Sequence, residues 1–246
     1  MRDEIPVAPS LLIIDATSGD PANQIYIRNK VKDFEEMGWM ASVFNAKNMP
    51  EFKLLVGAMS HRYDSVIVQM PVRDDIYFDY TMLPRLKDAD GLHPLSPVIP
   101  ATVRGIIDYL DACEFEYEGK TAVVLGRSDI VGKPMAKELL NKNMTVSVCH
   151  SRTPLEIRER LLKDADLVVC AVGQAGILKR ADCPNAFVVD VGINRVNGKL
   201  VGDFVEEEGM KEASTPVPGG VGLLTRLGLL KNCVDLKRRE EQNWEC

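Results

Sequence analysis

Short apolar runs alternate along the chain with segments in which apolar residues recur every three to four positions. The short runs are rich in Val, Leu and Ile, which is typical of buried strands, and the longer periodic segments indicate helices with one apolar face. Strands are predicted at residues 10–15, 40–44, 65–70, 120–125, 145–149, 166–172 and 187–191. Helices are predicted at residues 21–37, from 50 onward, and at 102–110, 133–141, 154–162 and 223–239. This alternation predicts an α/β fold with parallel sheets and helices on both sheet faces.

Residues that favour caps and turns mark several of these boundaries. Asp20 before Pro21 predicts a helix start, and Gly38 predicts where that helix ends. Thr102 and Thr153 are predicted to cap two later helices. Asn197-Gly198 predicts a tight hairpin between two short strands.

A charged stretch without apolar periodicity, residues 112–119, predicts a domain boundary. We expect a first domain over residues 1–115, with the C-terminal helix at about 223–246 packed back on it. Residues 116–222 are expected to form the second domain. No internal repeat or low-complexity segment interrupts this division.

Composition narrows the function classes. The 246 residues include 30 Lys and Arg against 36 Asp and Glu, a net charge of −6, and no long basic run, which disfavours nucleic acid and anionic membranes as partners. No apolar run approaches a membrane span, and the first residues lack a signal-peptide pattern. Six scattered cysteines without a Cys-x-x-Cys pair indicate free thiols in a reducing cytoplasm, and three dispersed histidines give no metal spacing.

A small-residue turn follows the strand predicted at 120–125 and precedes a helix. Gly126 to Gly132 fit the phosphate-binding turn of dinucleotide folds, although Ser128 stands at the middle glycine. An ordinary tight turn is the alternative. The strand that ends near Cys149, about twenty residues downstream, favours the cofactor interpretation.

The end of that later strand bears on the choice of cofactor. NAD-specific folds place a carboxylate there to bind the ribose hydroxyls, whereas this chain has His150-Ser151-Arg152-Thr153. Ser151, with Arg127 or Arg152, offers a hydrogen bond and positive charge to a phosphate. A polar helix start is the alternative, and both hold together. NADP is the predicted cofactor.

Other polar residues are placed where a ligand would meet them. Tyr26 and Lys30 share one helix face beside its apolar stripe, although spacing alone favours an ordinary helix surface. Gln69 ends a predicted strand, and in parallel sheets ligands lie beyond the carboxyl ends of strands. Asp90 is either a ligand acceptor or a turn residue. The Pro- and Gly-rich segment 215–222 suggests backbone lying flat against a ligand.

Together these stretches resemble the bifunctional 5,10-methylenetetrahydrofolate dehydrogenase/5,10-methenyltetrahydrofolate cyclohydrolases. The matching segments follow the family's order across nearly the whole chain: residues 19–26 with Lys30, then 68–71, 87–91, 126–134, 150–153, 190–194 and 215–222. The sequence departs from the family pattern in places, for example Asn23 where Ser is usual and Leu223-Leu224 where Pro-Met is usual.

The resemblance implies two α/β domains with a folate cleft between them, the second a Rossmann-type parallel sheet that binds NADP. It implies oxidation of 5,10-methylenetetrahydrofolate to the methenyl form, then hydrolysis to 10-formyltetrahydrofolate. It also implies a homodimer joined through the cofactor domains and a small-molecule folate substrate, with no metal.

The resemblance further assigns roles to individual residues. Lys30 matches the catalytic lysine, Tyr26 its stacking partner for folate, Gln69 the residue that positions the lysine, and Asp90 the pterin anchor. Substrate contacts are implied for Tyr26, Lys30, Val68, Gln69, Met70, Asp90, Pro218, Gly219, Gly220, Gly222 and Thr225. Cofactor contacts are implied for Gly126, Arg127, Ser128, Ser151, Arg152 and Ile193.

Three other classes of protein share part of this pattern. A short-chain dehydrogenase also uses Tyr-x-x-x-Lys, but downstream of its glycine-rich turn, whereas Tyr26 and Lys30 precede that turn by about a hundred residues. A shikimate-dehydrogenase-like enzyme shares the two-domain order but does not account for Gln69-Met70-Pro71. A non-catalytic folate- or nucleotide-binding regulator would not need Lys30.

Overall fold

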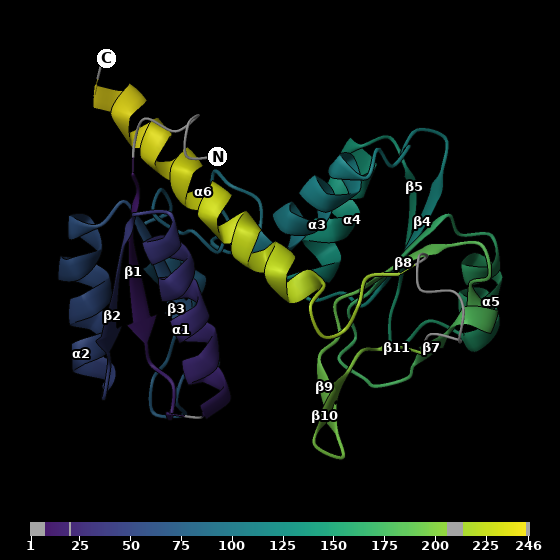
Figure 1. Ribbon diagram of the computed structural model, residues 1–246, viewed down its shortest axis with the longest axis horizontal. Helices are drawn as coiled ribbons and strands as arrows, with labels where there is room; N and C mark the ends of the chain where they lie inside the picture. Colours follow the sequence, from purple (N-terminus) through teal and green to yellow (C-terminus); the bar gives the residue numbers. More distant parts are fainter. Residues whose placement is uncertain (1–7, 20, 206–213, 245–246) are drawn as a thin grey trace. The chain divides into compact units, whose positions relative to one another are not determined.

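The computed structural model describes residues 8–19, 21–205 and 214–244 (Figure 1). The chain divides into two compact units. Unit 1 comprises residues 1–101 and 229–246, and unit 2 comprises residues 102–228. The predicted domains, residues 1–115 with the helix at about 223–246 and residues 116–222, are defined by the ligand that each is expected to bind. That division stays a prediction.

Unit 1 contains a three-stranded parallel sheet in the order β2-β1-β3. Its elements in chain order are β1 (Ser10–Asp15), α1 (Pro21–Glu36), β2 (Met40–Asn45), α2 (Met49–Leu54), the π turn η2 (Leu55–Met59), the 3₁₀ turn η3 (Ser60–Arg62), β3 (Ser65–Gln69) and the 3₁₀ turn η4 (Tyr80–Met82). Two helices belong to both units. Helix α3 (Ala101–Ala112) begins at the last residue of the first segment of unit 1 and continues in unit 2, and helix α6 (Val221–Trp244) begins in unit 2 and continues in unit 1 from residue 229. The predicted strands of this half are confirmed to within a residue at each end.

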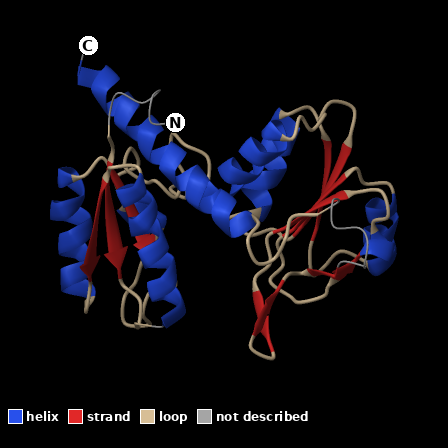
Figure 2. Cartoon of the chain, in the orientation of Figure 1, coloured by secondary structure: helices blue, strands red, loops and turns tan. Residues whose placement is uncertain are grey.

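Alternate residues of β1 serve two cores. Leu12 and Ile14 pack with Phe52 of α2 on one face of the sheet. Leu11 and Ile13 pack on the other face with residues of α1 and α6 that include Phe34. Because successive side chains of a strand point to opposite faces, a strand that is apolar throughout requires helices on both sides. Figure 2 shows the strands of unit 1 between their helices.

The predicted end of α1 near Gly38 and its buried face are confirmed. Ile27 and Phe34 are buried, and Gly38 has φ +74°, the left-handed conformation that ends a helix. Asp20, the predicted cap, lies outside the described residues.

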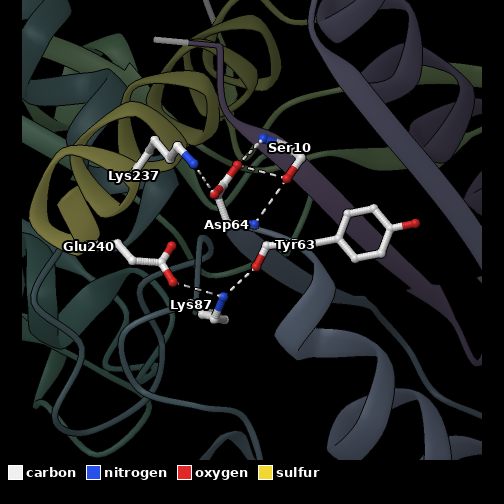
Figure 3. A network of polar contacts seen from close by, with 6 residues as sticks. All are labelled: Ser10, Tyr63, Asp64, Lys87, Lys237 and Glu240. Carbon is white, nitrogen blue, oxygen red and sulfur yellow. Dashed lines mark hydrogen bonds and ion pairs between the residues drawn. The ribbon is translucent and has the colours of Figure 1, made fainter. Parts of the chain in front are cut away.

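A polar network ties α6 to the amino-terminal edge of the unit 1 sheet (Figure 3). Asp64 accepts from the Ser10 backbone N–H at 2.8 Å and from the Ser10 hydroxyl at 2.7 Å. Its other oxygen accepts from Lys237 Nζ of α6 at 2.7 Å. Lys87 lies 3.5 Å from Glu240 Oε1 on the same helix. These contacts fasten the last helix to the starts of β1 and β3.

Unit 2 contains a four-stranded parallel sheet in the order β5-β4-β6-β8, with α3 and α4 on one face and α5 on the other. Its elements are β4 (Thr121–Leu125), α4 (Gly132–Asn141), β5 (Thr145–Cys149), α5 (Leu155–Lys163), β6 (Leu167–Cys170), β7 (Leu178–Lys179), the 3₁₀ turn η5 (Arg180–Asp182), β8 (Phe187–Asp190), β9 (Asn194–Val196), β10 (Lys199–Val201) and β11 (Phe204–Val205). The hairpin predicted at Asn197-Gly198 is confirmed, since both residues have positive φ and join β9 to β10. The predicted α/β class with parallel sheets is confirmed.

Two predicted helix caps are wrong. Helix α3 begins at Ala101, so Thr102 lies inside it, and its hydroxyl lies 3.1 Å from the Thr225 hydroxyl. Thr153 accepts from the His150 backbone N–H at 3.0 Å and leaves the start of α5 without a side-chain cap. A threonine hydroxyl has several possible hydrogen-bond partners nearby, and here both hydroxyls bond to partners other than the helix N-terminus.

None of the described helices is long and apolar enough to cross a membrane.

Candidate functional site

Lys30 and Gln69 meet at the carboxyl end of the unit 1 sheet. Lys30 Nζ on α1 donates to Oε1 of Gln69, the last residue of β3, at 3.1 Å. Gln69 is 8% exposed, and its Nε2 donates to the Met70 carbonyl at 3.0 Å. Since the Nε2 contact fixes which way the amide faces, its oxygen is held toward the lysine. The ammonium group has two further N–H donors for a ligand.

The start of α1 is fixed by the end of β1. Asp15 is buried and accepts from the backbone N–H and the hydroxyl of Thr17, at 3.0 and 2.7 Å. Its second oxygen accepts from Gln24 Nε2 at 2.8 Å. Tyr26 lies one helical turn before Lys30 and is 43% exposed. A flat ligand therefore has access to the tyrosine on the helix face that carries the lysine.

Asp90 belongs to the same group. Burial raises the pKa of the Asp90 carboxyl, and the positive charge of Lys30 opposes that rise, so the two side chains lie within electrostatic reach. The turn around Asp90 is tight, because a Cβ on Gly91 would lie 2.6 Å from the Ile99 carbonyl oxygen and its φ is +71°. Tyr26, Lys30, Gln69 and Asp90 thus share one end of unit 1.

Two residues that sequence reasoning missed support the Asp90 turn. Asp88 is fully buried, and its Oδ2 accepts from the His93 backbone N–H at 2.6 Å. Asn232 of α6 is also fully buried, and its Nδ2 lies 2.9 Å from each of the carbonyl oxygens of Ala89 and Ile99. The only sequence signal for Asn232 is an amide on the otherwise apolar stripe of the last helix.

The two remaining unit 1 residues predicted to bind substrate, Val68 and Met70, differ in the exposure of their side chains. The Val68 side chain is buried with the core on the α2 face, so only its backbone can meet a ligand. Met70 is 39% exposed.

The Pro- and Gly-rich segment of unit 2 is shaped by its own backbone. Pro218 and Gly219 are exposed, and Gly219 has φ +99°. A Cβ on Gly220 would lie 2.3 Å from the Pro216 carbonyl oxygen. Helix α6 begins at Val221, so Gly222, which was predicted in the loop, is helical, and Thr225 lies in the helix as predicted. The Thr225 hydroxyl donates to the Val221 carbonyl at 3.0 Å.

A cavity of about 350 Å³ opens at the carboxyl ends of β4, β5 and β6. Four of the six residues predicted to bind cofactor line it, namely Gly126, Arg127, Ser128 and Ser151. In a parallel sheet whose strand order reverses on either side of a central strand, this is where a nucleotide binds.

The turn after β4 is too tight for side chains. Gly126 has φ +113°, and a Cβ there would lie 2.3 Å from the Ala171 carbonyl oxygen. A Cβ on Gly132, the first residue of α4, would lie 2.4 Å from the Gly126 carbonyl oxygen. The Ser128 hydroxyl accepts from the backbone N–H groups of Val131 and Gly132 at 3.2 and 3.3 Å. A helix N-terminus packed this closely on a glycine turn fits a diphosphate.

Arg152 and Ile193 do not line this cavity, whereas Arg158 does. Arg158 lies on α5 four residues before the buried Leu162, on the helix face turned to the sheet. A charged residue on that apolar face is the signal that sequence reasoning missed. Ile193 follows β8 and is half exposed.

A buried aspartate joins the loops that follow β6 and β8. Asp203 Oδ2 accepts from the backbone N–H groups of Val172 and Gly173 at 2.8 and 2.7 Å. Its Oδ1 accepts from Asn194 Nδ2 at 2.8 Å. The segment that carries Ile193 is therefore held against the segment that borders the cavity.

Comparison with known proteins places the chain in a family. Residues 100–241 match the model described as "Tetrahydrofolate dehydrogenase/cyclohydrolase, NAD(P)-binding domain". The chain is 40% identical to the bifunctional protein FolD of Bacillus subtilis over 256 residues, which cover 95% of this chain and 88% of that protein.

Solved structures agree. The crystal structure of the bifunctional FolD enzyme of Campylobacter jejuni has a TM-score of 0.88 and 36% identity, covering 95% of this chain and 89% of that one. The FolD of Trypanosoma brucei, solved with NADP and an inhibitor, has a TM-score of 0.83 and 30% identity, covering 94% of this chain and 87% of that one. This chain is a member of the FolD family of bifunctional methylenetetrahydrofolate dehydrogenase/cyclohydrolases, with an NAD(P)-binding domain.

Proposed function

We propose that this protein oxidises 5,10-methylenetetrahydrofolate with NADP and then hydrolyses the methenyl product to 10-formyltetrahydrofolate, with Lys30 as the residue that moves protons. The observation that carries the role of Lys30 is its 3.1 Å contact with Gln69, beside Asp90 at the carboxyl end of the unit 1 sheet. Family membership supplies the reaction, and these contacts support the assignment of residues.

The two half-reactions make different demands on the side chains. Oxidation leaves the positive charge on an amidine-like cation and needs no strong acid or base. Hydrolysis adds water to that cation, which releases a proton, and then breaks a carbon–nitrogen bond, for which the leaving nitrogen needs a proton. Lys30 takes and returns that proton, Gln69 holds the amine in place, and Tyr26 stacks on the folate. Asp90 accepts hydrogen bonds from the pterin.

The residues of unit 2 fit a dinucleotide. NADP, when bound, accepts the hydride from the folate. Gly126 and Gly132 let the backbone approach its diphosphate, and Arg127 and Ser151 offer charge and a hydrogen bond to its 2′-phosphate. Arg152 and Ile193 are assigned to the cofactor by family resemblance alone.

Turnover of methylenetetrahydrofolate with NADP, followed by NADPH absorbance and by loss of the methenyl product, tests this function. Both signals are expected from the wild-type protein. Tight folate binding without NADPH or NADH formation would instead indicate a binding protein on the same fold.

We also propose a cytoplasmic homodimer joined through the cofactor domains. The hairpin β9–β10 exposes Val196 and Leu200, and Val205 of β11 is also exposed, apolar surface that a second copy would cover. Sedimentation equilibrium tests this. The wild-type protein is expected to be a dimer, and Leu200→Glu is expected to weaken its association. A wild-type protein that is a monomer at all concentrations would exclude the dimer.

A further inference from the structure

The cavity of unit 2 has an unusual charge distribution. Its lining includes Arg127, Arg158 and His150 but no aspartate or glutamate. Arg127 comes from the turn after β4, and Arg158 comes from α5, so the two guanidinium groups reach the cavity from different elements. A site with this lining favours an anionic ligand.

Arg158 is placed at the end of β5. Arg158 and Cys149, the last residue of that strand, line the same cavity, and burial raises the pKa of the Cys149 thiol while the positive charge of Arg158 opposes that rise. His150 and Ser151, which follow Cys149, also line this cavity. In dinucleotide folds the adenosine ribose lies at the end of this strand, whereas the diphosphate lies at the helix that follows the first strand.

The Arg158 side chain is incompletely satisfied. Its Nε is buried and has no hydrogen-bond partner among the described residues. A buried donor without an acceptor is unfavourable, and a guanidinium presents Nε together with an Nη as a pair that matches two oxygens of a phosphate. The cavity is the place from which such oxygens would come.

We propose that Arg158 is a specificity-determining residue that binds the 2′-phosphate of NADP from α5, together with Arg127 and Ser151. The proposal rests on the NADP preference proposed above and adds a residue that neither the glycine turn nor the segment 150–153 contains. It assigns discrimination between NADP and NAD partly to a helix rather than to the loop after β5.

The test compares adenosine 2′,5′-bisphosphate with 5′-AMP, two probes that differ only in the 2′-phosphate. Binding of each is measured by titration calorimetry to the full chain of the wild type, Arg158→Ala and Arg158→Lys. Arg160→Ala is the matched control, since Arg160 lies on the same helix, is exposed and does not line the cavity. Thermal unfolding of each variant reports on its stability.

Arg158→Ala is expected to weaken binding of the bisphosphate about ten- to a hundredfold and to leave 5′-AMP within about twofold of the wild type. Arg158→Lys retains the charge without the paired donors and is expected to fall between the two. Arg160→Ala is expected to match the wild type with both probes.

Two failures are distinguishable. A wild-type protein that binds both probes equally would contradict the proposed NADP preference itself. A wild type that discriminates, with Arg158→Ala and Arg158→Lys discriminating equally well or losing both probes in parallel, would show that Arg158 only supports the fold, while the NADP preference would stand.

Discussion

The two units use the same edge of a parallel sheet in different ways. At the carboxyl edge of unit 1, side chains contact one another: Lys30 with Gln69, and Asp15 with Thr17 and Gln24. At the carboxyl edge of unit 2, the tight turn that begins at Gly126 borders a cavity of about 350 Å³, whose lining includes Arg127 and Arg158. A unit that moves protons needs ionisable side chains held in place, whereas a unit that holds a nucleotide needs space and free N–H groups.

The first prediction removes Lys30, the proposed proton carrier of unit 1. Lys30→Met is expected to lower methenyltetrahydrofolate hydrolysis about 10²- to 10⁴-fold, because water attack and nitrogen departure lose their acid–base group. NADP binding in unit 2 should be unchanged. Separate measurements of NADPH formation and methenyl loss on one preparation check this.

The matched control for this variant is Lys32→Met, because Lys32 lies two residues along α1 in an exposed pair with Glu36. If Lys30→Met hydrolyses methenyltetrahydrofolate at the wild-type rate above the spontaneous background, Lys30 is not catalytic, and Tyr26 and Lys30 are ordinary surface residues of the helix.

The second prediction concerns Asp90, the proposed folate anchor. Asp90→Ala should lower kcat/KM of both activities by roughly ten- to a hundredfold, since a carboxylate that accepts hydrogen bonds from the pterin positions it for both reactions. Asp90→Asn keeps one acceptor and should lose less. Steady-state kinetics of each half-reaction decide; damage to one activity alone would contradict the anchoring role.

The third prediction separates the units. Gly132→Ala places a Cβ 2.4 Å from the Gly126 carbonyl oxygen, and the turn must shift at a cost of about 1–3 kcal/mol. NADP binding and dehydrogenase activity should fall about tenfold or more, while hydrolysis of supplied methenyltetrahydrofolate persists. Gly57→Ala is the control, because nothing lies within 4 Å of a Cβ there. Equal loss of hydrolysis below the unfolding temperature would mean that the two edges do not divide the work.

The smallest effect is expected at the opposite edge of unit 1. Burial raises the pKa of the Asp64 carboxyl, but hydrogen bonds from Lys237 and Ser10 outweigh it, and the pKa lies below its ordinary value. The stabilisation is therefore complete above the ordinary pKa of an aspartate and is lost as the pH falls through the lowered pKa.

Asp64→Asn tests this difference between the edges. The variant should lose about 1–2 kcal/mol of unfolding free energy near neutral pH and less in acid, with kcat unchanged. Urea unfolding at about pH 7 and about pH 3 measures it. A constant difference across that range would exclude the carboxylate as the cause.

Sequence reasoning located the main strands because each is a continuous apolar run between polar turns. It missed β7 and β11, which contain two residues each and have no periodicity to detect. The hairpin at Asn197-Gly198 was predictable because that dipeptide tolerates positive φ at both positions. The predicted caps at Thr102 and Thr153 were wrong because the hydrogen-bond partner of a hydroxyl depends on which groups the tertiary structure places near it.

The candidate site was predictable where it follows a strand. Gln69 and the Gly126 turn come directly after β3 and β4, and the topology of parallel strands places them at an edge. Arg158 and Asn232 come from helices, and which helix face meets a cavity or a loop depends on packing across many residues. A polar residue within an apolar helix stripe is the trace that both leave in the sequence.

The Ser128 hydroxyl has a consequence for how fast a nucleotide leaves. It already accepts from the Val131 and Gly132 N–H groups at the start of α4. A phosphate oxygen that binds here, as proposed, competes with this internal acceptor, so it exchanges one hydrogen bond for another and gains only the difference. The same hydroxyl is ready to take back both donors when the oxidised or reduced nucleotide departs. We therefore expect the nucleotide to dissociate faster than it would from a turn without this hydroxyl, which suits a protein that must exchange its nucleotide in every catalytic cycle.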